Sequence, residues 1–76
     1  MFTLLDTVVL TRDLPENGLR AGDLGAVVEC LGDEHYMIEF VRASGATQAL
    51  VTVGADHLRA LGDADVLAVR TVRVAA

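Results

Sequence analysis

A chain of 76 residues has room for one domain, and its composition argues against several functional classes. It carries a net charge of −5 and no lysine, so it lacks the basic surface with which proteins bind nucleic-acid phosphates. A lone cysteine cannot form an internal disulfide, and no apolar run approaches the roughly 20 residues of a membrane-spanning helix. We therefore expect one cytoplasmic domain over residues 1–76 that does not bind membranes.

Short segments rich in β-branched and aromatic residues recur along the chain and are separated by turns. The strongest pattern is the alternation of Tyr36, Ile38 and Phe40 with more exposed positions, which predicts a half-buried central strand. The segments predicted as barrel strands are 7–11, 26–31, 35–42, 46–53 and 59–61.

Two connections between these strands have a recognisable pattern. A long loop over residues 12–23 follows the first strand, and we expect Leu14 and Leu19 to anchor it on the core. Residues 54–58 favour a single 3₁₀ turn directly before the last barrel strand.

Gly22, Asp23 and Gly25 predict a tight corner at the start of the second strand. Glycine can adopt positive φ and allows another part of the chain to approach closely, while the aspartate can accept hydrogen bonds from nearby amides. We expect this corner to direct the chain into a strongly bent strand, as closure of a small barrel requires.

Residues 62–76 are predicted to form a C-terminal extension outside the barrel. Asp63 or Asp65 can N-cap one helical turn, and the valine-rich segment 68–74 favours an additional strand.

The order of these elements predicts an all-β, SH3-like barrel of about five strands over residues 5–61. At this point the sequence resembles the DUF4926 family of small bacterial domains of unknown function, through "DTVVLTRDLPENGLRAGDLGAVVE", "YMIEFV" and "ADHLRAL". The shorter Gly-Asp-x-Gly-x-Val piece is shared with KOW domains and other SH3-like barrels. The resemblance implies an SH3-like fold and a bacterial source, and it supplies no activity, catalytic residue or cofactor.

Few side chains in this sequence could carry chemistry. His35, His57 and Cys30 are far apart in sequence, whereas a zinc site needs three or four ligands in close approach. We expect Cys30 to occupy an inward position and to behave as a small hydrophobic residue.

Asp13, Glu16 and Asp23 gather around the first loop, and for them we favour turn chemistry and solubility over a cation site. We predict no catalytic residue, no metal and no cofactor.

The chain has more apolar side chains than so small a core requires, because 53% of its residues are hydrophobic. The strand alternation places some of them outward, where they form a candidate interaction face: Met37, Val41, Val27, Leu50, Val72 and Val74. Two interpretations stay open. Either the two ends of the chain fold over this face, or another protein or a second copy covers it.

These features favour a non-enzymatic protein-interaction module that binds another protein or itself, for example as a homodimer. One alternative is a KOW-like nucleic-acid-associated domain, suggested by the glycine turn and the strand order, although the acidic charge disfavours nucleic acid. Another is an accessory subunit of a larger enzyme or of a toxin–antitoxin system, which rests on analogy of fold alone.

Overall fold

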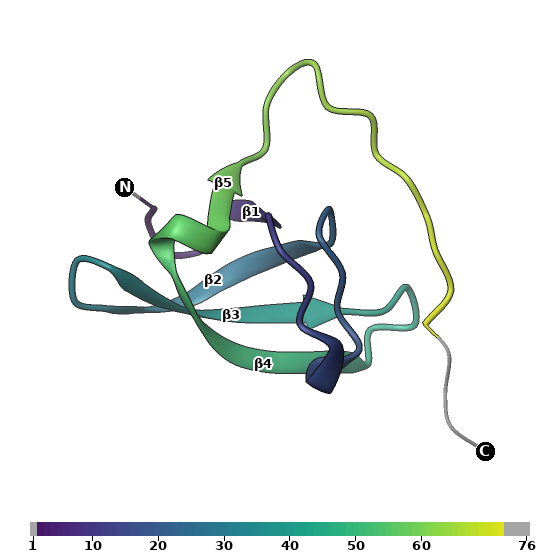
Figure 1. Cartoon of the computed structure of the whole chain (residues 1–76), viewed down its shortest axis with the longest axis horizontal. Helices are drawn as coiled ribbons and strands as arrows, with labels where there is room; N and C mark the ends of the chain where they lie inside the picture. The colour runs from purple at the N-terminus through teal and green to yellow at the C-terminus, as the bar shows by residue number, and fades with distance from the viewer. Residues whose placement is uncertain (1, 73–76) are drawn as a thin grey trace.

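The computed structural model describes residues 2–72, and the regular elements of that part are five strands and two 3₁₀ turns (Figure 1). The strands form one open antiparallel sheet in the order β4-β3-β2-β1-β5, which is the order of an SH3-like barrel. The predicted all-β class is confirmed, as is the order along the chain of five strands with a 3₁₀ turn before the last of them. The elements are β1 (Thr7–Leu10), η1 (Pro15–Asn17), β2 (Leu24–Leu31), β3 (His35–Val41), β4 (Thr47–Gly54), η2 (Ala55–His57) and β5 (Leu58–Ala60).

The core lies on the inner face of the sheet and is centred on β3. Tyr36, Ile38 and Phe40 are almost completely buried, as their alternation predicts. Phe2 packs edge-on against Tyr36, with ring centroids 5.3 Å apart. The other buried members of this core cluster are Val8, Leu10, Leu19, Val27, Val53 and Leu58.

The long first loop is ordered by the two leucines predicted to anchor it. Leu19 is buried in the core and Leu14 packs against the core. The backbone amides of both leucines donate to the carbonyl of the other, at 2.9 and 3.1 Å. The 3₁₀ turn η1 between them was not predicted, and it ends at Gly18 in the left-handed region.

The two glycines of the predicted corner are required for different reasons. Gly22 has a φ of 97°, which favours glycine, and Asp23 Oδ2 accepts a hydrogen bond from the Arg20 amide at 2.8 Å. Gly25 lies against β3, where an added Cβ would be only 2.5 Å from Ile38 Cγ2 and 2.9 Å from Phe40 Cε2. The turn at residues 21 and 22 precedes β2, and Gly25 is a packing requirement near the start of that strand.

Val27 was predicted to face outward, and the structure corrects this. Val27 pairs with Ile38 and is completely buried, whereas Glu29 already pairs with Met37 on the outer face. A β-bulge between Val27 and Glu29 accommodates Val28 as an extra residue and shifts the alternation by one position.

Cys30 was expected to be buried, and this too is wrong. It pairs with the inward-facing Tyr36, but it lies toward the end of the β2–β3 hairpin and is exposed. Its Sγ is 4.0 Å from the carbonyl oxygen of Phe2. The β2–β3 hairpin projects from the rest of the chain at this end (Figure 1), so pairing with Tyr36 is not sufficient to bury Cys30.

The C-terminal extension also differs from prediction. Residues 62–65 form a hydrogen-bonded turn instead of a capped helical turn, and residues 66–72 do not join the sheet. The strand predicted over 68–74 is therefore wrong for 68–72, and residues 73 and 74 lie outside the described part. Across residues 2–72, none of the helical turns has the length and hydropathy needed to cross a membrane.

Candidate functional site

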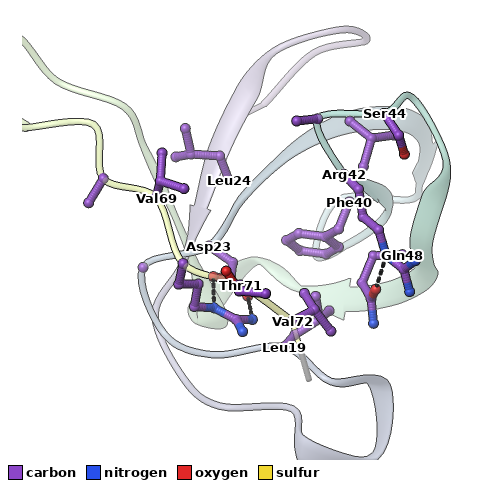
Figure 2. Close-up of a pocket in the computed structure, with 15 residues that line it drawn as sticks. Leu19, Asp23, Leu24, Phe40, Arg42, Ser44, Gln48, Val69, Thr71 and Val72 are labelled. Atoms are coloured by element: carbon purple, nitrogen blue, oxygen red, sulfur yellow. Dashed lines mark hydrogen bonds and ion pairs between the residues drawn. The ribbon is translucent and has the colours of Figure 1, made fainter. Parts of the chain in front are cut away.

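A groove of about 520 Å³ lies between the end of the barrel and the C-terminal segment, here defined as residues 66–72 (Figure 2). One wall comes from the start of β2, the end of β3 and the β3–β4 turn, and the other from the C-terminal segment. Its larger apolar lining residues are Leu19, Leu24, Phe40, Val41, Val69 and Val72.

The barrel side of the groove combines a buried base with an exposed rim. Leu19 and Phe40 are core residues, so their inner sides are fixed by packing and only their edges reach the groove. Leu24 and Val41 are exposed and form the rim. Rigid apolar walls of this kind are typical of surfaces that bind another molecule.

Arg70 attaches the C-terminal segment to the barrel. Its Nε donates to Asp23 Oδ1 at 2.9 Å and its Nη2 donates to Asp23 Oδ2, a bidentate ion pair that Figure 2 marks with dashed lines. Nη2 also donates to the carbonyl oxygen of Gly18 at 2.9 Å. Asp23 therefore holds the corner before β2 and the C-terminal segment together.

The pKa of the Asp23 carboxyl is lowered, which favours the charged form that this ion pair requires. Partial burial raises its pKa, but hydrogen bonds from Arg70 and from the Arg20 amide outweigh that effect, so the pKa lies below its ordinary value of 3.8. At neutral pH the carboxylate is charged and the contact with Arg70 is fully formed.

This pKa shift predicts how the C-terminal segment responds to acid. Because the folded-state pKa is lowered, the ion pair stabilises the fold above about pH 4 and loses its effect as the pH falls through the lowered pKa. We expect the amide resonances of Thr71 and Val72 to stay unchanged from pH 7 to about pH 4 and to move only below it. A transition of these resonances near neutral pH would contradict this assignment.

A second ion pair fixes the chain where it leaves β5. Arg59 donates to both carboxylate oxygens of Asp65 at 2.9 Å, and the Gly62 amide donates to Asp65 Oδ2 at 2.7 Å. These hydrogen bonds lower the pKa of Asp65 to about 2. The turn over 62–65 therefore keeps its charge pairing in acid, and the C-terminal segment starts from a defined position.

Between these two ion pairs, over residues 66–69, the large apolar side chains are exposed to solvent. Val66, Leu67 and Val69 are 90%, 67% and 98% exposed, respectively. Figure 1 shows this stretch arching away from the sheet after β5 and returning beside the β3–β4 turn. Of these three side chains, Val69 lines the groove.

The residues of the predicted interaction face do not form one surface in the structure. Val41 and Val72 line the groove, whereas Met37 is half-buried and Leu50 exposed on the outer face of the sheet, away from it. Val27 belongs to the core. Val74 lies outside the described residues.

Sequence reasoning missed the residues that join the two walls of the groove. Asp23 was predicted as a turn residue, and the prediction did not include its partner Arg70, which is 47 positions away. Leu24 and Val69 were not predicted as rim residues either. One available signal was the charge distribution, because every acidic residue precedes residue 66.

Two of the loop carboxylates, Asp13 and Asp23, accept hydrogen bonds from backbone amides. Asp13 Oδ1 accepts a hydrogen bond from the Ala21 amide at 2.9 Å, alongside the bond from the Arg20 amide to Asp23. Within residues 2–72 no three histidine, cysteine or acidic side chains lie close enough together to hold a metal ion.

Comparison with known proteins identifies the family of this barrel. The model of the family described as "Domain of unknown function (DUF4926)" matches residues 4–60, which contain every strand of the sheet. The chain belongs to the DUF4926 family. No curated protein and no solved structure matches it. The DUF4926 match ends before the C-terminal segment, so the groove combines a family barrel with a wall that the family model does not include.

Proposed function

We propose that the chain is a non-enzymatic protein-interaction module whose binding surface is the groove and its exposed apolar rim. The observation that carries this proposal is the position of Leu24, Val41 and Val69, three exposed apolar side chains that line one groove. Apolar surface gathered around a concavity is characteristic of a surface that buries a partner.

The charged groups of the groove support binding rather than catalysis. Asp23 is held by Arg70, and Arg42 donates through Nε to Gln48 Oε1 at 2.8 Å. A general acid or base needs a carboxyl or imidazole poised to exchange a proton with a substrate. The Asp23 carboxyl has a lowered pKa instead, and it serves as a fixed anion for an arginine.

The arginines of the described residues also favour a protein partner over nucleic acid. Phosphate binding draws on arginines that are free to face a backbone. Here four arginines contact groups of the chain itself: Arg12 with His57, Arg42 with Gln48, Arg59 with Asp65 and Arg70 with Asp23.

Photo-crosslinking from the groove tests the proposal. A photoreactive amino acid at Val41 is expected to crosslink to a polypeptide in living cells several-fold more efficiently than the same group at Leu4. The two side chains are matched controls because they are 58% and 60% exposed, and Leu4 does not line the groove. Mass spectrometry of the products measures the yields, and equal yields at the two positions would contradict the proposal.

A further inference from the structure

The C-terminal segment has a different charge from the barrel that holds it. All eleven acidic residues and four of the six arginines precede residue 66, which gives that part a formal charge of −7 (4 − 11). Residues 66–76 contain two arginines and no acidic residue, and most of the others are apolar. The end of the chain thus has the composition of a basic, apolar peptide that complements an acidic barrel.

The contact between the two parts is made by a side chain and not by strand pairing. The Arg70 guanidinium reaches both oxygens of Asp23 and the carbonyl of Gly18, while residues 66–72 add no strand to the sheet. Val72 lies beside Gly18 as well, since its Cγ1 would be 3.8 Å from a Cβ on that glycine. An arginine from a second copy of the chain would find the same acceptor atoms.

In a single copy, the connection that leads to Arg70 leaves apolar side chains exposed to water. It runs from β5 through the turn at 62–65 and then exposes Val66 and Val69 almost fully and Leu67 by about two thirds. If two identical connections cross, the apolar side chains of each cover those of the other. This removes apolar surface from water, which is favourable. Exchange of a terminal segment between identical chains repeats every native contact and adds this new one.

We propose that two copies of the chain exchange their C-terminal segments, so that Arg70 of each copy binds Asp23 of the other. This inference rests on the proposed function and identifies the partner as a second copy.

The exchanged dimer must compete with the arrangement within one chain, where the tether holds the segment at an effective concentration on the order of millimolar. The contacts available only to the dimer come from the crossing connections, through Val66, Leu67 and Val69.

Charge reversal at the two ends of the ion pair tests this exchange. Asp23→Arg and Arg70→Asp each place like charges at the contact, both within one chain and between copies of the same variant. In a mixture of the two variants, exchange pairs opposite charges at both contacts. We expect each variant alone to have the 8.0 kDa mass of one chain in sedimentation and the mixture to form a one-to-one complex of twice that mass.

The double variant, with both substitutions in one chain, is the matched control because it restores the pairing in every arrangement. Circular dichroism establishes that each single variant is folded before mixing. A mixture of folded variants that keeps the mass of one chain overturns the exchange. If Val41 then still crosslinks to a different polypeptide, the proposed function stands without it.

A second measurement leaves Asp23 intact, in case its replacement unfolds the corner. Gln48 and Val72 both lie beside Gly18, and Gln48 Nε2 would be 2.8 Å from a Cβ there. In a Cys30→Ser background, Gln48→Cys with Val72→Cys is expected to form disulfides between chains, seen as a covalent dimer on a non-reducing gel. Disulfides formed exclusively within single chains would overturn the proposal.

Discussion

Replacing Gly25 with alanine is expected to lower the free energy of unfolding by about 3 kcal/mol, the upper end of the usual cost of overpacking a core. The added Cβ would meet Ile38 Cγ2 at 2.5 Å, and the Glu39 carbonyl oxygen at 3.1 Å blocks retreat on the backbone side. Ile38 is itself completely buried and cannot move into solvent. Urea unfolding, followed by far-ultraviolet circular dichroism, measures the change.

Gly62→Ala is the control for this substitution. The nearest atom to its added Cβ is Asp65 Oδ2 at 3.6 Å, an ordinary contact, and Gly62 does not need positive φ. We expect a change within about 0.5 kcal/mol. Equal effects of the two substitutions would mean that β2 does not approach β3 as closely at Gly25 as the structure places it.

Shortening Ile38 to alanine is expected to cost about 3–4 kcal/mol, because the substitution leaves a cavity in a core that cannot collapse around it. Ile38 lies in the central strand β3 and pairs with Val27 on one side and Val51 on the other. In a domain of this size, such a loss is a large share of the total stability. Thermal and urea unfolding measure the loss.

Leu50→Ala, on the outer face of the neighbouring strand β4, is the matched control. Its side chain is exposed, so we expect a change of about 0.5 kcal/mol or less. A cost at Leu50 as large as that at Ile38 would show that the outer face of the sheet is buried in solution, contrary to the structure.

The sequence was sufficient to predict the strands because their patterns are local. Tyr36, Ile38 and Phe40 repeat with the period of a strand, and the 3₁₀ turn before β5 follows a glycine at the end of β4. The glycine corner was predictable for the same reason, since its residue types are those that tight turns require.

The register of β2 could not be predicted, because Val27 and Val28 are both valine. A bulge that inserts one of them leaves no trace in composition, yet it decides which of the two enters the core. The prediction therefore placed Val27 on the outer face of β2, although its side chain lies on the inner face.

The C-terminal segment was mispredicted because strand propensity is a weak guide without a partner strand. Residues 68–72 are rich in β-branched side chains, which favour a strand. However, the chain leaves the sheet after Ala60, the last residue of β5, and crosses to the opposite end of the barrel. What places it there is the ion pair between Arg70 and Asp23, which no local pattern predicts. The groove could not be predicted for the same reason.

The central claim is that the C-terminal segment is attached to the barrel through Arg70 and packs beside Gly18. Nuclear Overhauser effects from the Val72 methyl groups test it most directly, because Val72 Cγ1 lies 3.8 Å from the Cβ position of Gly18. The structure predicts strong cross-peaks to the α-protons of Gly18 that disappear in Arg70→Asp. Val72 methyl groups that contact only their neighbours in sequence would contradict the account.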